Sequence, residues 1–102
     1  MANITWTARA EFDLEYHARR IARDSVAHAI KWMAKIRAKV AMLESLPEIG
    51  SPVEDLQFPG FRELIVRNFR IVYRVRNGDC EIIAILRAEQ DINRAFGSEP
   101  PT

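Results

Sequence analysis

Segment 61–87, FRELIVRNFRIVYRVRNGDCEIIAILR, is the part of this chain that most constrains its fold. Its runs of β-branched and aromatic residues predict three antiparallel strands. Asn77 and Gly78 separate the last two runs, and Asn-Gly is the strongest sequence signal for a two-residue hairpin turn. Both faces of these strands carry apolar residues, although a sheet needs only one apolar face to fold. The second face therefore needs a cover of its own.

Counting outward from the Asn77-Gly78 turn predicts the register, because opposed residues of an antiparallel pair share a face. The predicted pairs are Val75–Cys80, Arg74–Glu81, Tyr73–Ile82, Val72–Ile83, Ile71–Ala84, Arg70–Ile85 and Phe69–Leu86. The first face then carries Phe69, Ile71, Tyr73, Val75, Cys80, Ile82, Ala84 and Leu86. The second face has Val72, Ile83 and Ile85 at its centre and Arg70, Arg74, Arg76, Asp79, Glu81 and Arg87 around them. A turn at Arg67-Asn68 adds Glu63 and Ile65 to the second face and Leu64 and Val66 to the first.

Composition is that of an ordinary globular domain, with 48% hydrophobic and 28% charged residues. A length of 102 residues predicts one domain spanning residues 1–102. The formal net charge of +1 argues against binding nucleic acid by bulk attraction. A single cysteine, Cys80, excludes an internal disulfide. The chain has no membrane-length apolar run and no signal-peptide pattern, so we expect a cytoplasmic protein that does not bind membranes.

Two amphipathic helices are predicted before the strands, because apolar residues recur there every three or four positions. A short β-prone run at residues 3–7 leads into a helix over residues 8–23, which Thr7 can cap. Ser25 caps a second helix that runs to about Ser45. A turn-rich crossing segment follows. After the strands, residues 91–96 predict a helical turn and residues 97–102 a frayed tail.

The predicted fold is α+β with two layers, in which the helical hairpin covers the first face of the three-strand antiparallel meander. No predicted element remains for the second face around Val72, Ile83 and Ile85. An apolar patch ringed by charge marks a contact site for another macromolecule, so we predict that a partner protein binds there. The alternative is that the C-terminal segment folds back over this face, or that its apolar residues stay half exposed.

Residues suited to catalysis are few. His17 and His28 lie on predicted helices and form no metal-ligand pair, so we predict no metal and no cofactor, and we place His17 in the core. The arginines of the strands and turns suit capture of phosphate or carboxylate: Arg62, Arg67, Arg70, Arg74 and Arg87. The alternative is that they form salt bridges with Glu63, Asp79 and Glu81. Arginine alone supplies no proton shuttle at neutral pH.

Several local strings follow this order of predicted elements. They are Asp13-Leu14 in the first helix, LESLPEIGSPV at 43–53, FRELIV at 61–66 and FRIVYRVRNGD at 69–79. In this combination the chain resembles the ParE/RelE superfamily of bacterial type II toxins, from Ile4 to Ile92. The resemblance implies a compact toxin that halts growth until a cognate antitoxin neutralises it.

The superfamily divides into RelE-like toxins that cleave mRNA on the ribosome and ParE-like toxins that poison DNA gyrase. In the RelE-like branch, the resemblance assigns Arg70 to the catalytic set, with Arg62 and Arg87 at matching basic positions. That branch usually carries a tyrosine, or a histidine-tyrosine pair, at or beyond the last strand, and no tyrosine follows Arg87 here. The resemblance therefore favours a gyrase poison over an mRNA endoribonuclease.

The resemblance also implies a partner, namely a ParD-like or other type II antitoxin in a toxin–antitoxin hetero-oligomer. We expect the antitoxin or the target to bind Ile65, Arg67, Arg70, Val72, Arg74, Ile83, Ile85 and Arg87. Catalytic roles are predicted only under the nuclease alternative, for Arg62, Arg70 and Arg87. A non-toxic module that only binds an antitoxin-like partner is the third alternative.

Overall fold

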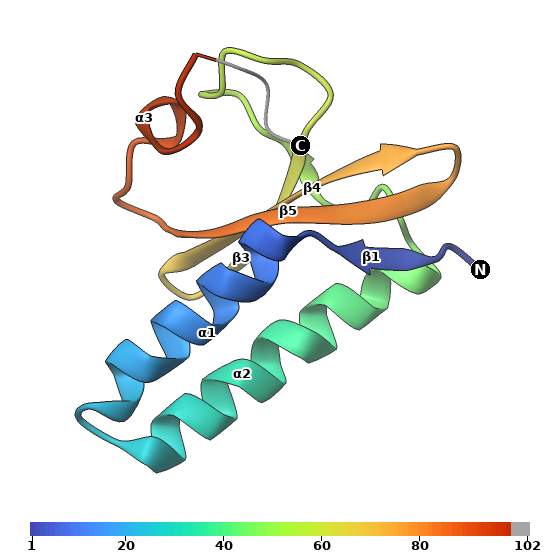
Figure 1. Cartoon of the computed structure of the whole chain (residues 1–102). Helices are drawn as coiled ribbons and strands as arrows, with labels where there is room; N and C mark the ends of the chain where they lie inside the picture. The colour runs from blue at the N-terminus through green and yellow to red at the C-terminus, as the bar shows by residue number, and fades with distance from the viewer. Residues whose placement is uncertain (99–102) are drawn as a thin grey trace.

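The computed structural model describes residues 1–98, and its elements follow the predicted order (Figure 1). The elements are β1 (Ile4–Trp6), α1 (Ala8–Ala22), α2 (Val26–Ala41), the 3-10 helix η1 (Met42–Glu44), β2 (Ser51–Pro52), β3 (Arg62–Val66), β4 (Phe69–Arg76), β5 (Asp79–Arg87) and α3 (Ile92–Phe96). The fold is α+β, and the predicted C-terminal helical turn is α3. The tail predicted at residues 97–102 lies mostly outside the described residues.

Side-chain caps begin both helices of the hairpin. Thr7 Oγ1 accepts a hydrogen bond from the Ala10 backbone N–H at 3.1 Å, and Ser25 Oγ accepts one from His28 N–H at 3.1 Å. Each cap satisfies a backbone donor that the first helical turn leaves without a partner. The hairpin of α1 and α2 then packs against one face of the sheet (Figure 1). Both predicted caps are confirmed.

The strands form one five-stranded sheet in the order β1-β5-β4-β3-β2. β1 pairs in parallel with β5, so the N-terminal strand extends the predicted meander at its β5 edge. β2 pairs with β3 at the other edge. The β3–β4 register is the predicted one, with Leu64 opposite Ile71 and Ile65 opposite Arg70.

The β4–β5 register is as predicted only from the turn to the pair Tyr73–Ile82. A β-bulge between Val72 and Tyr73 then leaves Ile83 as an extra residue on β5, so that Val72 faces Ala84. The pairs that follow are Ile71–Ile85, Arg70–Leu86 and Phe69–Arg87. The predicted pairs Val72–Ile83, Ile71–Ala84, Arg70–Ile85 and Phe69–Leu86 are therefore wrong. The bulge moves Ile85 to the helix side of the sheet and Ala84 and Leu86 to the other side.

Apolar side chains fill both sides of this sheet. On the helix side, α1 and α2 pack against Leu64, Ile71, Tyr73, Cys80, Ile82 and Ile85. On the far side, the apolar cover packs against Val72, Ile83, Ala84 and Leu86. This cover consists of Val53 and Leu56 of the crossing segment, Phe61 just before β3, and Ile92 of α3. The expectation of an uncovered face is wrong, since burying this surface within the chain is more favourable than leaving it in water. The alternative cover by the C-terminal segment is correct for Ile92, and the crossing segment with Phe61 supplies the rest.

Replacing Ile83 with Asp tests this cover. Ile83 is 1% exposed, so the buried carboxylate should lower the free energy of unfolding by about 4 kcal/mol or abolish folding. Ile65→Asp is the matched control, because Ile65 is 56% exposed on the same sheet and should cost less than about 1 kcal/mol. Urea unfolding followed by circular dichroism measures both. Equal stability of the two variants would mean that the far face is open.

Candidate interaction surface

The sequence places Arg70 in the charged rim of the second face. In the structure its side chain is buried and forms ion pairs within the chain. Its Nε donates to Glu63 Oε1 at 2.5 Å, and its two terminal nitrogens donate to the Asp55 carboxylate at 2.7 and 3.0 Å. Only 10% of the Arg70 side chain is exposed. Hydrogen bonds to Asp55, and then to Glu63, raise the pKa of Arg70 against the opposing effect of burial. The same bond from Arg70 lowers the pKa of Asp55. Arg70 is thus fully engaged inside the chain.

Other arginines are also engaged within the chain. Arg74 pairs with Glu81 at 2.6 Å, as the alternative of a cross-strand salt bridge predicts. Arg87 pairs with Glu89 at 2.5 Å. These internal pairs neutralise much of the positive rim expected on the sheet.

The arginines of the nuclease alternative do not converge. Arg62 lies opposite Tyr73 on the helix side, where it donates to the Gly50 carbonyl oxygen at 2.8 Å. Arg70 lies on the far side with Glu63 and Asp55. Arg87 of β5 lies opposite Phe69, across β4 from Arg62 and four residues farther along that strand. This separation offers no shared phosphate-binding pocket.

The residues expected to bind the antitoxin or the target divide by exposure. Val72, Ile83 and Ile85 are at most 1% exposed, and Arg70 is 8% exposed, so these side chains do not form the surface expected from the sequence. Arg74 is half-buried in its pair with Glu81. The remaining members of the expected set are exposed: Ile65, Arg67 and Arg87. Both Ile65 and Arg67 lie at or beside the β3–β4 turn.

Beyond the end of β1, backbone groups of β5 form hydrogen bonds with the side chains of Thr7 and of two α1 residues. Thr7 Oγ1 donates to the Ile82 carbonyl oxygen at 2.9 Å. Asp13 Oδ2 accepts from the Ile85 N–H at 3.0 Å, and His17 Nε2 binds the Ile85 carbonyl oxygen at 2.9 Å. Because a carbonyl can only accept, the Nε2 of His17 carries the proton. His17 is a satisfied core residue, as predicted.

A groove of about 340 Å³ lies between α1 and the end of β5, and we call it the α1 groove. Phe12 and Tyr16 line it with 65% and 47% of their surfaces exposed, and their rings stack with centroids 6.0 Å apart. Arg20 lies over the Tyr16 ring, and Arg87 lines the groove from β5. Exposed aromatic and arginine side chains are typical of the centres of protein interfaces.

The α1 groove was missed by the sequence analysis. The available signal was the spacing of Phe12 and Tyr16 by four residues, which places both on one helical face. That face lies outside the apolar stripe that α1 turns to the core. Two aromatic residues on a helical face that does not point to the core indicate a contact surface.

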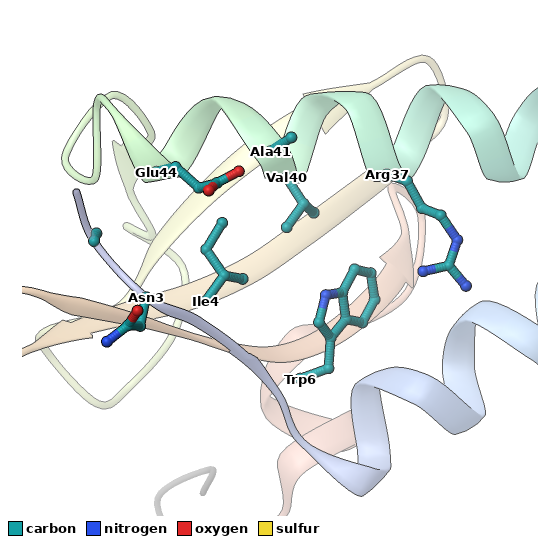
Figure 2. A pocket seen from close by; sticks show the side chains of 8 residues that line it. Asn3, Ile4, Trp6, Arg37, Val40, Ala41 and Glu44 are labelled. Atoms are coloured by element: carbon teal, nitrogen blue, oxygen red, sulfur yellow. The ribbon is translucent and has the colours of Figure 1, made fainter.

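A second hollow, of about 360 Å³, lies between β1 and the C-terminal part of α2 (Figure 2). Ile4 and Trp6 of β1 face Val40 of α2 across it (Figure 2). Arg37 and Glu44 bring opposite charges to its rim, and the Arg37 guanidinium lies over the Trp6 ring at 5.8 Å. These opposite charges give the hollow no preference for a ligand of either sign.

Residues 1–98 hold neither a metal-binding cluster nor a membrane-spanning helix. In this range, no group of three or more His, Cys, Asp or Glu side chains is placed to hold a metal ion. None of the helices in the same range combines the length and apolar character needed to span a membrane.

The fold and the sequence now identify the class of protein. A helical hairpin against an antiparallel meander, extended by an N-terminal strand, is the architecture of the RelE/ParE-type toxins. Residues 4–92 match the family described as ParE toxin of type II toxin-antitoxin system, parDE. The chain therefore belongs to the ParE toxin family.

Comparison with solved structures agrees with this assignment. The chain is similar to one in the structure titled "Chromosomal ParDE TA system from P. aeruginosa", with a TM-score of 0.74 and 25% sequence identity. The match covers 87% of this chain and 98% of the other. A comparison with curated proteins gives no significant match.

Arg70→Met tests the buried ion pair. It leaves the Glu63 carboxylate without its main partner in a largely buried position, and should lower the free energy of unfolding by about 3 kcal/mol. The double variant Arg70→Met/Glu63→Met removes both charges and should recover most of that loss. Arg76→Met, at an exposed arginine, should cost less than about 0.5 kcal/mol. A single Arg70→Met variant as stable as the wild type in urea would contradict this account.

His17 should make stability depend on pH. Burial lowers the pKa of His17 from its ordinary value of 6.5, partly offset by its bond to Ile85 and by Asp13, while Arg87 and Arg20 lower it further. The unfolded chain therefore binds the proton more readily, and stability falls as pH drops below about 6.5. His17→Gln keeps a donor for Ile85 but does not titrate, so it should show a smaller fall in unfolding free energy between pH 8 and pH 5. If the unfolding free energy of His17→Gln fell as much between these pH values as that of the wild type, His17 would not contribute to the pH dependence.

Proposed function

We propose that this chain is a cytoplasmic toxin of a type II toxin–antitoxin system, that it inhibits growth by poisoning DNA gyrase, and that a cognate antitoxin neutralises it in a hetero-oligomer. Membership of the ParE toxin family is the observation that carries this proposal. The likeness to a chain of a ParDE system supports the antitoxin partner.

The placement of the arginines supports a non-enzymatic toxin over an mRNA endoribonuclease. Cleavage of RNA needs a group that stabilises the charged transition state and a group that moves a proton. Arg70 is bound between two carboxylates, and Arg62 and Arg87 lie on the strands either side of β4, opposite Tyr73 and Phe69. His17, the only histidine near Arg87, binds the main chain of β5. This set offers no proton-transfer group beside a free arginine.

We further propose that the α1 groove contacts the target. Phe12 and Tyr16 supply apolar area that the fold does not bury, and Arg20, whose guanidinium lies over the Tyr16 ring, supplies charge beside it. Rigid aromatic rings lose little entropy on binding, so they suit the centre of an interface. The groove is also built on α1, whose position is fixed by the Asp13 and His17 bonds to Ile85.

A gyrase assay with purified toxin tests the proposed target. The toxin should inhibit supercoiling by gyrase and should accumulate cleaved DNA that remains bound to the enzyme. It should leave mRNA intact in a translating ribosome extract. Cleavage of mRNA with normal supercoiling would support the RelE-like alternative instead. An absence of growth arrest when the chain is expressed alone would favour the non-toxic binding module.

The double variant Phe12→Ser/Tyr16→Ser tests the α1 groove. Both side chains are exposed, so folding should change little, while the toxin concentration needed for half-inhibition of gyrase should rise about tenfold or more. Val26→Ser/Ile30→Ser is the matched control, because these residues are equally exposed and spaced on α2. Inhibition that both double variants reduce to the same degree would contradict a specific role for the groove.

A further inference from the structure

A cavity of about 490 Å³ lies between the hairpin and the β3–β4 turn, and we call it the basic cavity. Ile21 at the end of α1 and Trp32 of α2 contribute its apolar lining. The remaining lining residues are all basic: His28, Lys31, Lys35 and Arg67. No acidic residue lines it, unlike the hollow beside β1. The cavity therefore has a clear preference for a negatively charged occupant.

In the described part of the chain, the lysines and the arginine around this cavity have no paired acidic side chain. Among residues 1–98, no salt bridge or side-chain hydrogen bond reaches Lys31, Lys35 or Arg67. By contrast, Arg62, Arg70, Arg74 and Arg87 each contact a carboxylate. The fold thus neutralises the cations of the sheet and leaves those of the basic cavity available to another molecule.

Three local features beside the cavity each cost stability. Lys31 and Lys35 are spaced by four residues on α2, and like charges at that spacing repel. Arg67 has a φ of 53°, in the left-handed region that disfavours residues other than glycine or asparagine. The buried indole N–H of Trp32 has no hydrogen-bond acceptor in the described part of the chain. Features that cost stability gather at functional sites.

We infer that the basic cavity binds an acidic segment of the antitoxin, with carboxylates at Lys31, Lys35 and Arg67 and an apolar side chain against Ile21 and Trp32. This inference rests on the proposed function, which supplies the antitoxin as partner. It also gives a role to Arg67, an exposed member of the residue set expected from the sequence to bind a partner. The α1 groove is a neighbouring site that shares no lining residue with the basic cavity.

A peptide fits the cavity better than nucleic acid does. Binding to a nucleic acid backbone requires a track of cations along several phosphates, and here the cations surround one concave site on a chain of net charge +1. Single-stranded binding also uses exposed aromatic rings for stacking, whereas Trp32 is 6% exposed. An acidic and apolar peptide segment matches both the rim and the lining.

Charge reversal tests the inference. Calorimetry would measure the affinity of the toxin for a candidate antitoxin expressed from a reading frame beside its own. Lys31→Glu/Lys35→Glu should weaken binding about tenfold or more and should reduce its dependence on salt. Arg76→Glu/Arg94→Glu changes the charge equally at residues that do not line the cavity, one beside the β4–β5 turn and one on α3. It should change the affinity less than about twofold.

Arg67→Asn gives an independent test that separates binding from folding. Asparagine accepts the positive φ more readily than arginine, so the melting temperature should stay the same or rise. Removal of the guanidinium should nevertheless weaken antitoxin binding. A fall in affinity with unchanged or higher stability supports a recognition role, because a purely structural role would lower both together.

Other outcomes would overturn the inference. If wild-type toxin binds the antitoxin and Lys31→Glu/Lys35→Glu binds it equally well, the basic cavity is not the site, while the proposed function stands. If wild-type toxin does not bind the antitoxin, the inference and the antitoxin part of the proposed function both fail. If the same variant loses binding only to a short DNA duplex, the cavity binds phosphate and the inference is wrong.

Discussion

Strand β5 is the constraint on which the rest of the structure depends, because it is apolar on both faces and must be covered on both. The β-bulge at Ile83 divides its side chains between the two sides of the sheet. The helical hairpin covers one side, and the crossing segment with α3 covers the other. Backbone groups at the free edge of β5 bond to side chains of α1. A strand enclosed in this way cannot offer its faces to a partner without rearrangement.

Because both faces of β5 are covered, any partner must bind other surfaces of the isolated chain. On an open face Arg70 would be exposed to a partner. It instead forms ion pairs with Glu63 and Asp55 over the covered far side of the sheet. The hairpin and the β3–β4 turn do keep exposed apolar and basic side chains, among them Phe12, Tyr16 and Arg67. These surfaces are the ones proposed above for the target, at the α1 groove, and for the antitoxin, at the basic cavity.

The sequence predicts the elements of this fold well and one of its registers incompletely. The hairpin turn at Asn77-Gly78 and the helix caps at Thr7 and Ser25 depend only on neighbouring residues. They can therefore be predicted from the sequence alone. The bulge cannot, because residues 82–86 are all apolar and their pattern does not reveal a change of face. The sequence does not reveal the cover by Val53 and Leu56 either, since these residues lie in a turn-rich segment without a helical or strand period. The basic cavity joins residues far apart in the sequence and needs the fold to appear.

Hydrogen exchange of the isolated toxin tests the central claim, the enclosure of β5, most directly. Amides of Ile83, Ala84 and Leu86 should exchange only through global unfolding, with protection equal to that of the helix-side core residues Ile36 and Ile71. Addition of antitoxin should then slow exchange near the basic cavity rather than on the far face. Rapid exchange at Ile83 and Ala84 in the free toxin, with protection gained when antitoxin binds, would contradict the account.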